Sequence, residues 1–411
     1  MTYCLLEGMR VVEGAAFIAG PSCGLYLAQM GAEVIRFDNI GGGPDFRRWP
    51  LASNGASLYW EGLNKGKKSV AIDMSSPQGR ELAVALASAP GEDGGLFVTN
   101  FPVDGFLSYS ALSARRKDLI CLRVMGWPDG KTAVDYTVNA AMGLPLMTGP
   151  ISDPRPVNHV LPAWDLLTGA YAAFALLAAD RARQKSGQGQ EIRLPLSDVA
   201  ASTLSHLGQV AEVLNAGADR PRMGNDLFGA FGRDFATRDG RIIVVAITPR
   251  QWRDLVSLLG LVDPIAAIEA ELGVSFVADE GVRFIHRARL FPLFEAAFAG
   301  MDTASLKAQF DARGVCWSPY RTLGEALADS DGAFVGNPVF EDLLQPSGIH
   351  YPAAGSAATL SDMPREHLAP APRLGENTDE VLSGLLGLGD AEIARLHDQG
   401  VIAGPVPGFA G

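Results

Sequence analysis

The stretch from His159 to Gly189, HVLPAWDLLTGAYAAFALLAADRARQKSGQG, constrains this 411-residue chain more than any other. Pro162 suits the first position of a helix, where its missing N–H costs nothing, and Gly187 suits a left-handed cap at the end. From Leu166 to Ala179 almost every residue is apolar on all faces, which predicts a helix buried within a large protein. We therefore expect the carboxylate of Asp165, in the first turn, at the edge of a core.

The composition indicates a large globular protein, because 47% of the residues are hydrophobic and 19% are charged. The formal net charge of -12 disfavours nucleic acid and anionic membranes as partners, since both are bound through basic surfaces. The four cysteines are scattered without a CxxC pair, which disfavours a metal site or disulfides and suits a reducing cytosol. The N-terminus lacks a signal pattern, and the longest apolar run is too short to span a bilayer. We expect a cytoplasmic protein.

The N-terminal segment predicts a βαβ unit, with a buried strand at residues 9–13, a helix at 20–31 and a second strand at 32–38. Asp38 ends the second strand where an acid that binds ribose lies in a dinucleotide fold. The loop after Glu13, GAAFIAGPSCG, contains no G-x-G-x-x-G, so a nicotinamide enzyme is disfavoured. Further alternation of strands and helices implies a largely parallel sheet.

The run NKGKKS at residues 64–69 is a near miss to a phosphate-binding P-loop. The first glycine of that motif would fall on Glu61 and its Ser/Thr on Lys68, so we reject nucleotide hydrolysis. Three lysines around a glycine turn can still meet a phosphate, although a solvated cluster of charges is the commoner explanation.

Changes in composition divide the chain into three parts. Residues 1–224 are the first part of a large α/β domain with a Rossmann-like parallel sheet, and its last helix is expected at 198–214. A glycine-rich loop from Gly224 introduces a smaller α+β domain at residues 225–330. Residues 331–411 are a linker, proline-rich and mostly loop at 338–372, followed by C-terminal helices that return to the large domain.

Five segments, in this order, resemble the class III CoA-transferase (CaiB/BaiF) family: LEGMRVVEGAAFIAGPSCGLYLAQMGAEVIRFD, NKGKKSVAIDM, VTNFPVDGF, PAWDLLTGAYAAFALLAADRARQKSGQGQ and APRLGENTDEVLSGLLGL. The resemblance covers essentially the whole chain. It implies an acyl-CoA substrate, with CoA as part of that substrate and no separate cofactor. It also implies an interlocked homodimer, in which the small domain and linkers of each chain wrap round the partner.

The resemblance assigns the catalytic carboxylate to Asp165, although a first-turn aspartate ordinarily only complements the helix dipole. A carboxylate suits thioester exchange because its acyl adducts stay activated, whereas a serine would form an unactivated ester. Asp135 is equally suited to capping a helix, and His159 or Asn158 is a candidate for a substrate carboxylate, as are Arg47 and Arg48, with Arg47 preferred. The residues expected to bind substrate or CoA are Ile18, Arg36, Arg47, Lys68, Ile72, Asn100, Phe101, Asp135, His159 and Gly229.

Two further segments, VDYTVNAAMGLPLMTGP and PRMGNDLFGAFGRDF, are similar to a branch of this family that moves CoA between the two carboxyls of mesaconate, in the 3-hydroxypropionate cycle of carbon fixation. The resemblance places Val134 and Thr248 where racemases of the family carry a histidine and a carboxylate, so racemization is disfavoured. The alternatives are an intermolecular transferase that uses succinyl-CoA or another dicarboxylic acyl-CoA, and a non-catalytic CoA-binding protein.

Overall fold

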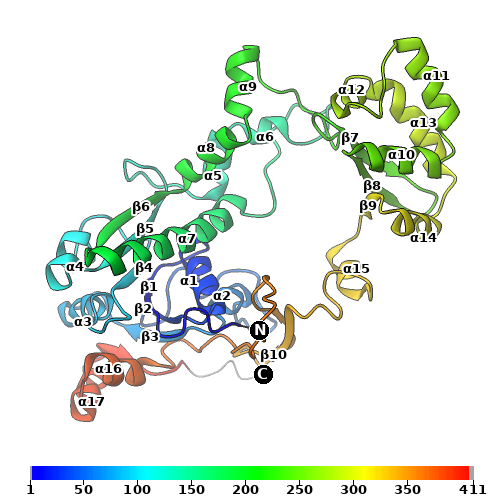
Figure 1. Cartoon of the computed structure of the whole chain (residues 1–411). Helices are drawn as coiled ribbons and strands as arrows, with labels where there is room; N and C mark the ends of the chain where they lie inside the picture. The colour runs from blue at the N-terminus through cyan, green and yellow to red at the C-terminus, as the bar shows by residue number, and fades with distance from the viewer. Residues whose placement is uncertain (1, 407–411) are drawn as a thin grey trace. The chain divides into compact units, whose positions relative to one another are not determined.

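The chain folds around a seven-stranded sheet, shown in Figure 1 with the rest of the computed structural model, which describes residues 2–406. The strand order is β12-β3-β2-β1-β4-β5-β6, and neighbouring strands are parallel except β12 and β3. The strands are β1 (Arg10–Gly14), β2 (Glu33–Asn39), β3 (Lys68–Ile72), β4 (Leu96–Thr99), β5 (Ile120–Met125), β6 (Gln190–Pro195) and β12 (Ile402–Ala403). The prediction of a Rossmann-like α/β fold with a largely parallel sheet is confirmed.

The inner strands of this sheet are largely buried, as expected where helices cover both faces. Val12, Phe37, Val70 and Phe97 lie on four different strands and are all less than 5% exposed. The helices connected to this sheet are α1 (Ala19–Gln29), α2 (Leu58–Asn64), α3 (Pro77–Ala87), α4 (Tyr109–Arg115), α5 (Asp135–Ala141), α7 (Ala163–Ser186), α8 (Leu196–His206), α16 (Thr378–Leu386) and α17 (Asp390–Asp398).

The order of the strands reverses at β1, since β2 and β3 extend to one side of it and β4 to β6 to the other. The chain therefore leaves the carboxyl ends of β1 and β4 in opposite directions, and ligands of open α/β sheets bind at such a point. Helix α1 begins directly after β1 and packs against α7. A Cβ atom at Gly169 of α7 would lie 2.9 Å from the carbonyl oxygen of Ala19, so only glycine permits this close approach near Asp165.

The chain comprises two compact units. The unit just described holds residues 2–142, 159–212 and 336–406 of the described chain, and the second holds 143–158 and 213–335. This division differs from the predicted 225–330 domain in three respects. The second unit begins earlier, within α9 (Gln209–Ala216), it ends slightly later, at residue 335, and it includes a segment that precedes the central helix in the sequence.

The second unit has an antiparallel sheet in the order β7-β8-β9 and an aromatic core. Phe231, Phe235, Trp252, Phe294 and Phe298 are at most 1% exposed. Its strands are β7 (Phe231–Ala236), β8 (Arg241–Ala246) and β9 (Cys316–Pro319), and its helices are α6 (Leu144–Met147), α10 (Pro249–Leu258), α11 (Val262–Leu272), α12 (Glu280–Ile285), α13 (Arg287–Ala299), α14 (Thr303–Arg313) and α15 (Leu323–Ala328).

One local prediction needs correction, and a second needs an addition. The helix expected at residues 198–214 is interrupted between α8 and α9, because Gly208 adopts a left-handed conformation with φ 75°. The proline-rich segment 338–372, expected to be mostly loop, also contains an antiparallel hairpin, β10 (Phe340–Leu344) with β11 (His350–Ala354).

Helix α7 begins and ends where its sequence signals predict, with one residue of difference at the start. Pro162 is the N-cap and not the first helical residue, and Gly187 ends the helix with φ 68° and donates a hydrogen bond to the carbonyl of Arg183. The helix is not buried on all faces, however. Tyr171 and Phe174 are 50% and 65% exposed in the single chain, so one apolar face of α7 lies at the surface.

Candidate active site

The amino end of α7 is held by a buried carboxylate, that of Asp135 at the start of α5. Its Oδ2 accepts hydrogen bonds from the backbone N–H groups of Trp164 (2.7 Å) and Asp165 (3.2 Å), and its Oδ1 contacts Nε2 of His159. The indole of Trp164 also donates to the side chain of Asn139 (3.1 Å). Asp135 therefore caps the helix that carries Asp165. Helix capping was one of the two roles considered for it, and substrate binding was the other.

Asp165 is a partly buried carboxyl group with a raised pKa. Loss of hydration on burial raises the pKa of Asp165 to about 6, the nearby negative charge of Asp135 adds to this rise, and the positive charge of Arg48 opposes it. This pKa lies below neutral pH, so the carboxylate is the major form at pH 7. The group is thus a base at neutral pH and more basic than an ordinary aspartate.

The loop between β1 and α1 is held in an unusual conformation next to this carboxylate. Phe17 has φ 71°, the only positive φ among the described residues other than glycine, and such strain costs about 1–3 kcal/mol. Its N–H donates to Asp45 (3.0 Å), while Asn100 exchanges two hydrogen bonds with the backbone of Ala16 (3.2 and 3.0 Å). Asn100, predicted to contact the ligand, thus links the carboxyl end of β4 to this loop.

Arg48 is the cation whose charge acts on Asp165. Its guanidinium carbon lies 5.5 Å from the ring centroid of Phe17 and 5.5 Å from that of Tyr59. The hydroxyl of Tyr59 is buried without a hydrogen-bond partner among the described residues. Neither aromatic residue was predicted as part of the site, because nothing in the local sequence distinguishes them from core residues.

A buried network of charges lies beneath the loop. The guanidinium of Arg36 donates to both oxygens of Asp38 (2.7 and 2.9 Å) and to Asp45 (2.8 Å), and it is only 1% exposed. Lys67 donates to Glu13 (2.9 Å) from an equally buried position. These pairs occupy the guanidinium of Arg36, and its predicted contact with CoA stays a prediction.

Lys68 and Ile72, also predicted to contact CoA, lie elsewhere. Lys68 begins β3 and so lies at the amino edge of the sheet, opposite the edge where β1 and β4 end, and it pairs with Glu33 (2.9 Å) and Glu380 (2.6 Å). Ile72 ends β3, but its side chain is fully buried in the core. The CoA contacts expected for both residues stay predictions.

The remaining predicted residues are divided between the two units. Ile18 is buried at the N-cap of α1, and Phe101 packs partly buried against the core of the sheet. Arg47 is exposed beside Arg48, with no ion pair to a described residue. Gly229 belongs to the second unit, where it has φ 80° and open space around it. Its predicted place beside the substrate stays a prediction.

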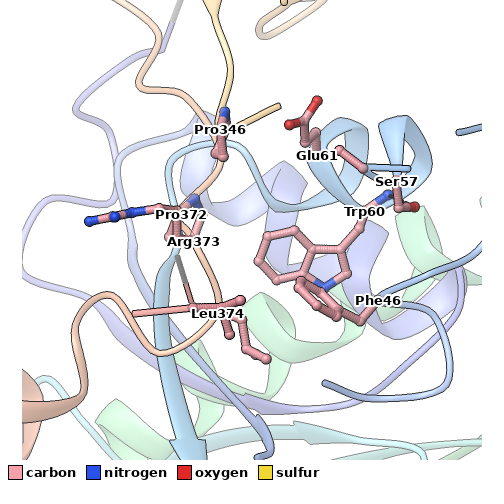
Figure 2. A pocket seen from close by; sticks show the side chains of 10 residues that line it. Phe46, Ser57, Trp60, Glu61, Pro346, Pro372, Arg373 and Leu374 are labelled. Carbon is pink, nitrogen blue, oxygen red and sulfur yellow. Dashed lines mark hydrogen bonds between the residues drawn. The ribbon is translucent and has the colours of Figure 1, made fainter. Parts of the chain in front are cut away.

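A small pocket lies between α2 and the segments near residues 346 and 373. Figure 2 shows the rings of Trp60 and Phe46 on one side and Leu374 opposite. Asp165 does not line this pocket, but Ser57, in its wall, donates to the carbonyl of Arg48 (2.6 Å). The pocket is therefore separate from Asp165, although one residue of its wall supports the backbone of Arg48.

The strand reversal, the strained loop and the aspartate at the capped end of α7 all belong to one α/β unit. The model of CoA-transferase family III matches residues 6–378, so the chain belongs to this family and is a CoA-transferring enzyme. The predicted family is confirmed. The helices among residues 2–406 include none with the length and apolar character needed to cross a membrane.

Two curated relatives and one solved structure show how similar the chain is to characterised members. It is 50% identical over 403 residues to the 2-methylfumaryl-CoA isomerase of Chloroflexus aurantiacus, covering 98% of each chain. It is 29% identical to the succinyl-CoA–D-citramalate CoA-transferase of the same organism, covering 97% of this chain and 98% of the relative. A CAIB/BAIF family protein from Brucella suis has the same fold, with a TM-score of 0.75, 25% identity and coverage of 93% and 99%.

Proposed function

We propose that this enzyme moves CoA within one molecule, from C1 to C4 of mesaconate, and so converts 2-methylfumaryl-CoA into 3-methylfumaryl-CoA. The observation that carries the proposal is the 50% identity, over 98% of both chains, to an enzyme named for isomerization of 2-methylfumaryl-CoA. Asp165 is partly buried at the capped end of α7, and its carboxylate is a nucleophile suited to that chemistry.

The proposed mechanism uses Asp165 as an acyl carrier. Its carboxylate attacks the C1 thioester carbonyl and expels CoA thiolate, which leaves a mixed anhydride; the thiolate then attacks the aspartyl carbonyl carbon and releases the C1 carboxylate. The C4 carboxylate attacks this aspartyl thioester and expels the thiolate again. Attack of the thiolate on the C4 carbonyl of the second anhydride forms the product and frees Asp165. CoA enters and leaves as part of the substrate, so the steps require no further cofactor.

Both intermediates hydrolyse readily, so the enzyme must exclude water from Asp165. Partial burial serves this purpose and raises the pKa of Asp165 at the same time. Asp135 fixes the amino end of α7 through two backbone N–H groups, which holds the nucleophile in one position through all four acyl transfers.

Isotope labelling tests the intramolecular route. We expect that free labelled mesaconate, added during turnover of unlabelled 2-methylfumaryl-CoA, does not appear in the product, because the acid stays bound until CoA has moved. The measurement is the label in CoA esters separated by chromatography. Label in the product at the level of the free acid would reject the intramolecular route.

The second candidate is transfer between two acids, with succinyl-CoA or another dicarboxylic acyl-CoA as donor. The 29% identity to a succinyl-CoA–D-citramalate CoA-transferase favours it over racemization. Thr248, at the position of the racemase carboxylate in the resemblance, caps α10 by accepting from the N–H of Gln251 (3.2 Å). A rate that depends on a second free acid would identify this activity.

We also propose that the enzyme acts as an interlocked homodimer, in which Asp165 of one subunit meets the loop around Gly229 of the other. The exposed apolar face of α7, with Leu167, Tyr171 and Phe174 at 39%, 50% and 65% exposure, supports a second copy as its cover. We expect a dimer at micromolar concentration in sedimentation velocity. A fully active monomer at that concentration would contradict the proposal.

A further inference from the structure

We propose that Arg48 binds the carboxylate of the acyl group that is not in the thioester. The guanidinium of Arg48 lies against the rings of Phe17 and Tyr59, and the hydroxyl of Tyr59 would donate a second hydrogen bond to the same carboxylate. The inference rests on the proposed function and extends it, because it names the residues that select dicarboxylic acyl-CoA esters. It also replaces Arg47, the preferred candidate of the sequence analysis, by its neighbour.

The guanidinium of Arg48 is placed for an anionic ligand. It is exposed and forms no ion pair with any carboxylate in the described part of the chain, although the arginines of the network below it, such as Arg36, are fully paired. The rings of Phe17 and Tyr59, each 5.5 Å from the guanidinium, restrict its motion. A planar guanidinium held in this way can grip a carboxylate with two hydrogen bonds.

The backbone N–H and the backbone carbonyl of Arg48 are both held by hydrogen bonds. Its N–H donates to the carbonyl of Asp45 (3.1 Å), and its carbonyl accepts from Ser57 Oγ (2.6 Å). The side chain of Asp45 also receives the N–H of Phe17 (3.0 Å), so one residue orients both the cation and a ring that flanks it. The conformation of Phe17, with its positive φ, is therefore explained by the position that it gives to the ring.

Tyr59 adds a hydrogen-bond donor to this position. Its hydroxyl is buried and has no partner in the described residues, which is unfavourable in the absence of ligand. Burial raises the pKa of Tyr59 above its usual range, so the hydroxyl keeps its proton and can donate it to a carboxylate oxygen.

The site also lies where the chemistry needs it. Phe17 precedes the N-cap residue of α1, and the first turn of α1 touches α7 at Gly169, one turn beyond Asp165. A free carboxylate near Asp165 would repel the nucleophile, and Arg48 supplies the opposite charge. Arg47, by contrast, has no ring or carboxylate of the described chain against it.

Matched ligands test the inference in the Asp165→Asn background, in which we expect turnover to be lost. Mesaconyl-CoA is compared with tiglyl-CoA, in which a methyl group replaces the free carboxylate, by calorimetric titration. We expect Arg48→Leu to weaken mesaconyl-CoA about ten- to a hundredfold and tiglyl-CoA less than about threefold. Arg48→Lys should restore part of the difference, and Tyr59→Phe should reduce it about three- to tenfold.

Equal weakening of both esters by Arg48→Leu would overturn the inference, as would a loss of selectivity in Arg47→Leu but not in Arg48→Leu. The same comparison with succinyl-CoA and butyryl-CoA separates this inference from the proposed function. Selectivity for succinyl-CoA that depends on Arg48, with no isomerization of mesaconyl-CoA by the intact enzyme, would reject the proposed reaction and retain the carboxylate site.

Discussion

Asp165→Asn is expected to remove CoA transfer while folding and CoA binding stay close to those of the unchanged enzyme. The amide has nearly the shape of the carboxylate but is a poor nucleophile, and the Asp165 side chain makes no hydrogen bond to the described residues that the change would break. We expect a loss of at least about a thousandfold in kcat, roughly 4 kcal/mol of barrier. The measurement is turnover of 2-methylfumaryl-CoA together with thermal unfolding of both proteins.

Chemical trapping distinguishes a nucleophile from a residue that merely complements the helix dipole. Hydroxylamine should convert an aspartyl thioester into a hydroxamate, detectable by mass at Asp165 only when acyl-CoA is present. Asp263, an exposed first-turn aspartate of α11, is the matched control, and Asp263→Asn should cost no more than about 0.3–1 kcal/mol of stability. Activity of Asp165→Asn within about tenfold of the unchanged enzyme, roughly 1.4 kcal/mol, would reject the nucleophile.

Elements with signals inside their own sequence were predictable. Helix α3 spans Pro77–Ala87 and shows such signals, because Ser76 caps it and a proline opens it. The C-cap of α7 at Gly187 follows from the same local chemistry. These contacts join residues only a few positions apart, so the chain carries them without reference to the rest of the fold.

Partners distant in sequence were not predictable. The acceptor of Lys67, Glu13, lies 54 positions away, so the lysine run could be interpreted only as a phosphate site or a solvated cluster. Arg47 and Arg48 are adjacent and identical in type, and only the positions of Phe17 and Tyr59 distinguish them. The resemblance to a family supplied Asp165, but the residues that surround it had to come from the structure.

Strand β7 illustrates a different failure. It begins within a segment expected to be a glycine-rich loop, because glycine is depleted in strands and the alternation of apolar residues is short. Its stability comes from Phe231 and Phe235, whose rings pack against α13. Tertiary packing thus overrides the low strand propensity of the glycine-rich segment, because strand propensity depends strongly on context.

The second large effect is expected for Lys67→Met, which should lower the free energy of unfolding by about 3–5 kcal/mol because it leaves Glu13 charged and buried. Burial already raises the pKa of Glu13, and Lys67 opposes that rise. Without the lysine, Glu13 is penalised wherever it must ionise. The penalty is therefore smallest below the unfolded-state pKa near 4.5 and grows as the pH rises above it. Urea denaturation at several pH values measures it.

Lys68→Met is the matched control, because the adjacent lysine carries the same charge on the same strand edge but is 34% exposed. Surface ion pairs such as those with Glu33 and Glu380 contribute about 0–1 kcal/mol, so this variant should unfold almost as the unchanged protein does. The pair also tests the role of the lysine run. If Lys68→Met weakened CoA binding about tenfold with stability unchanged, the predicted CoA contact of Lys68 would be supported; if Lys67→Met left stability unchanged, the buried network would not support the loop that carries Phe17.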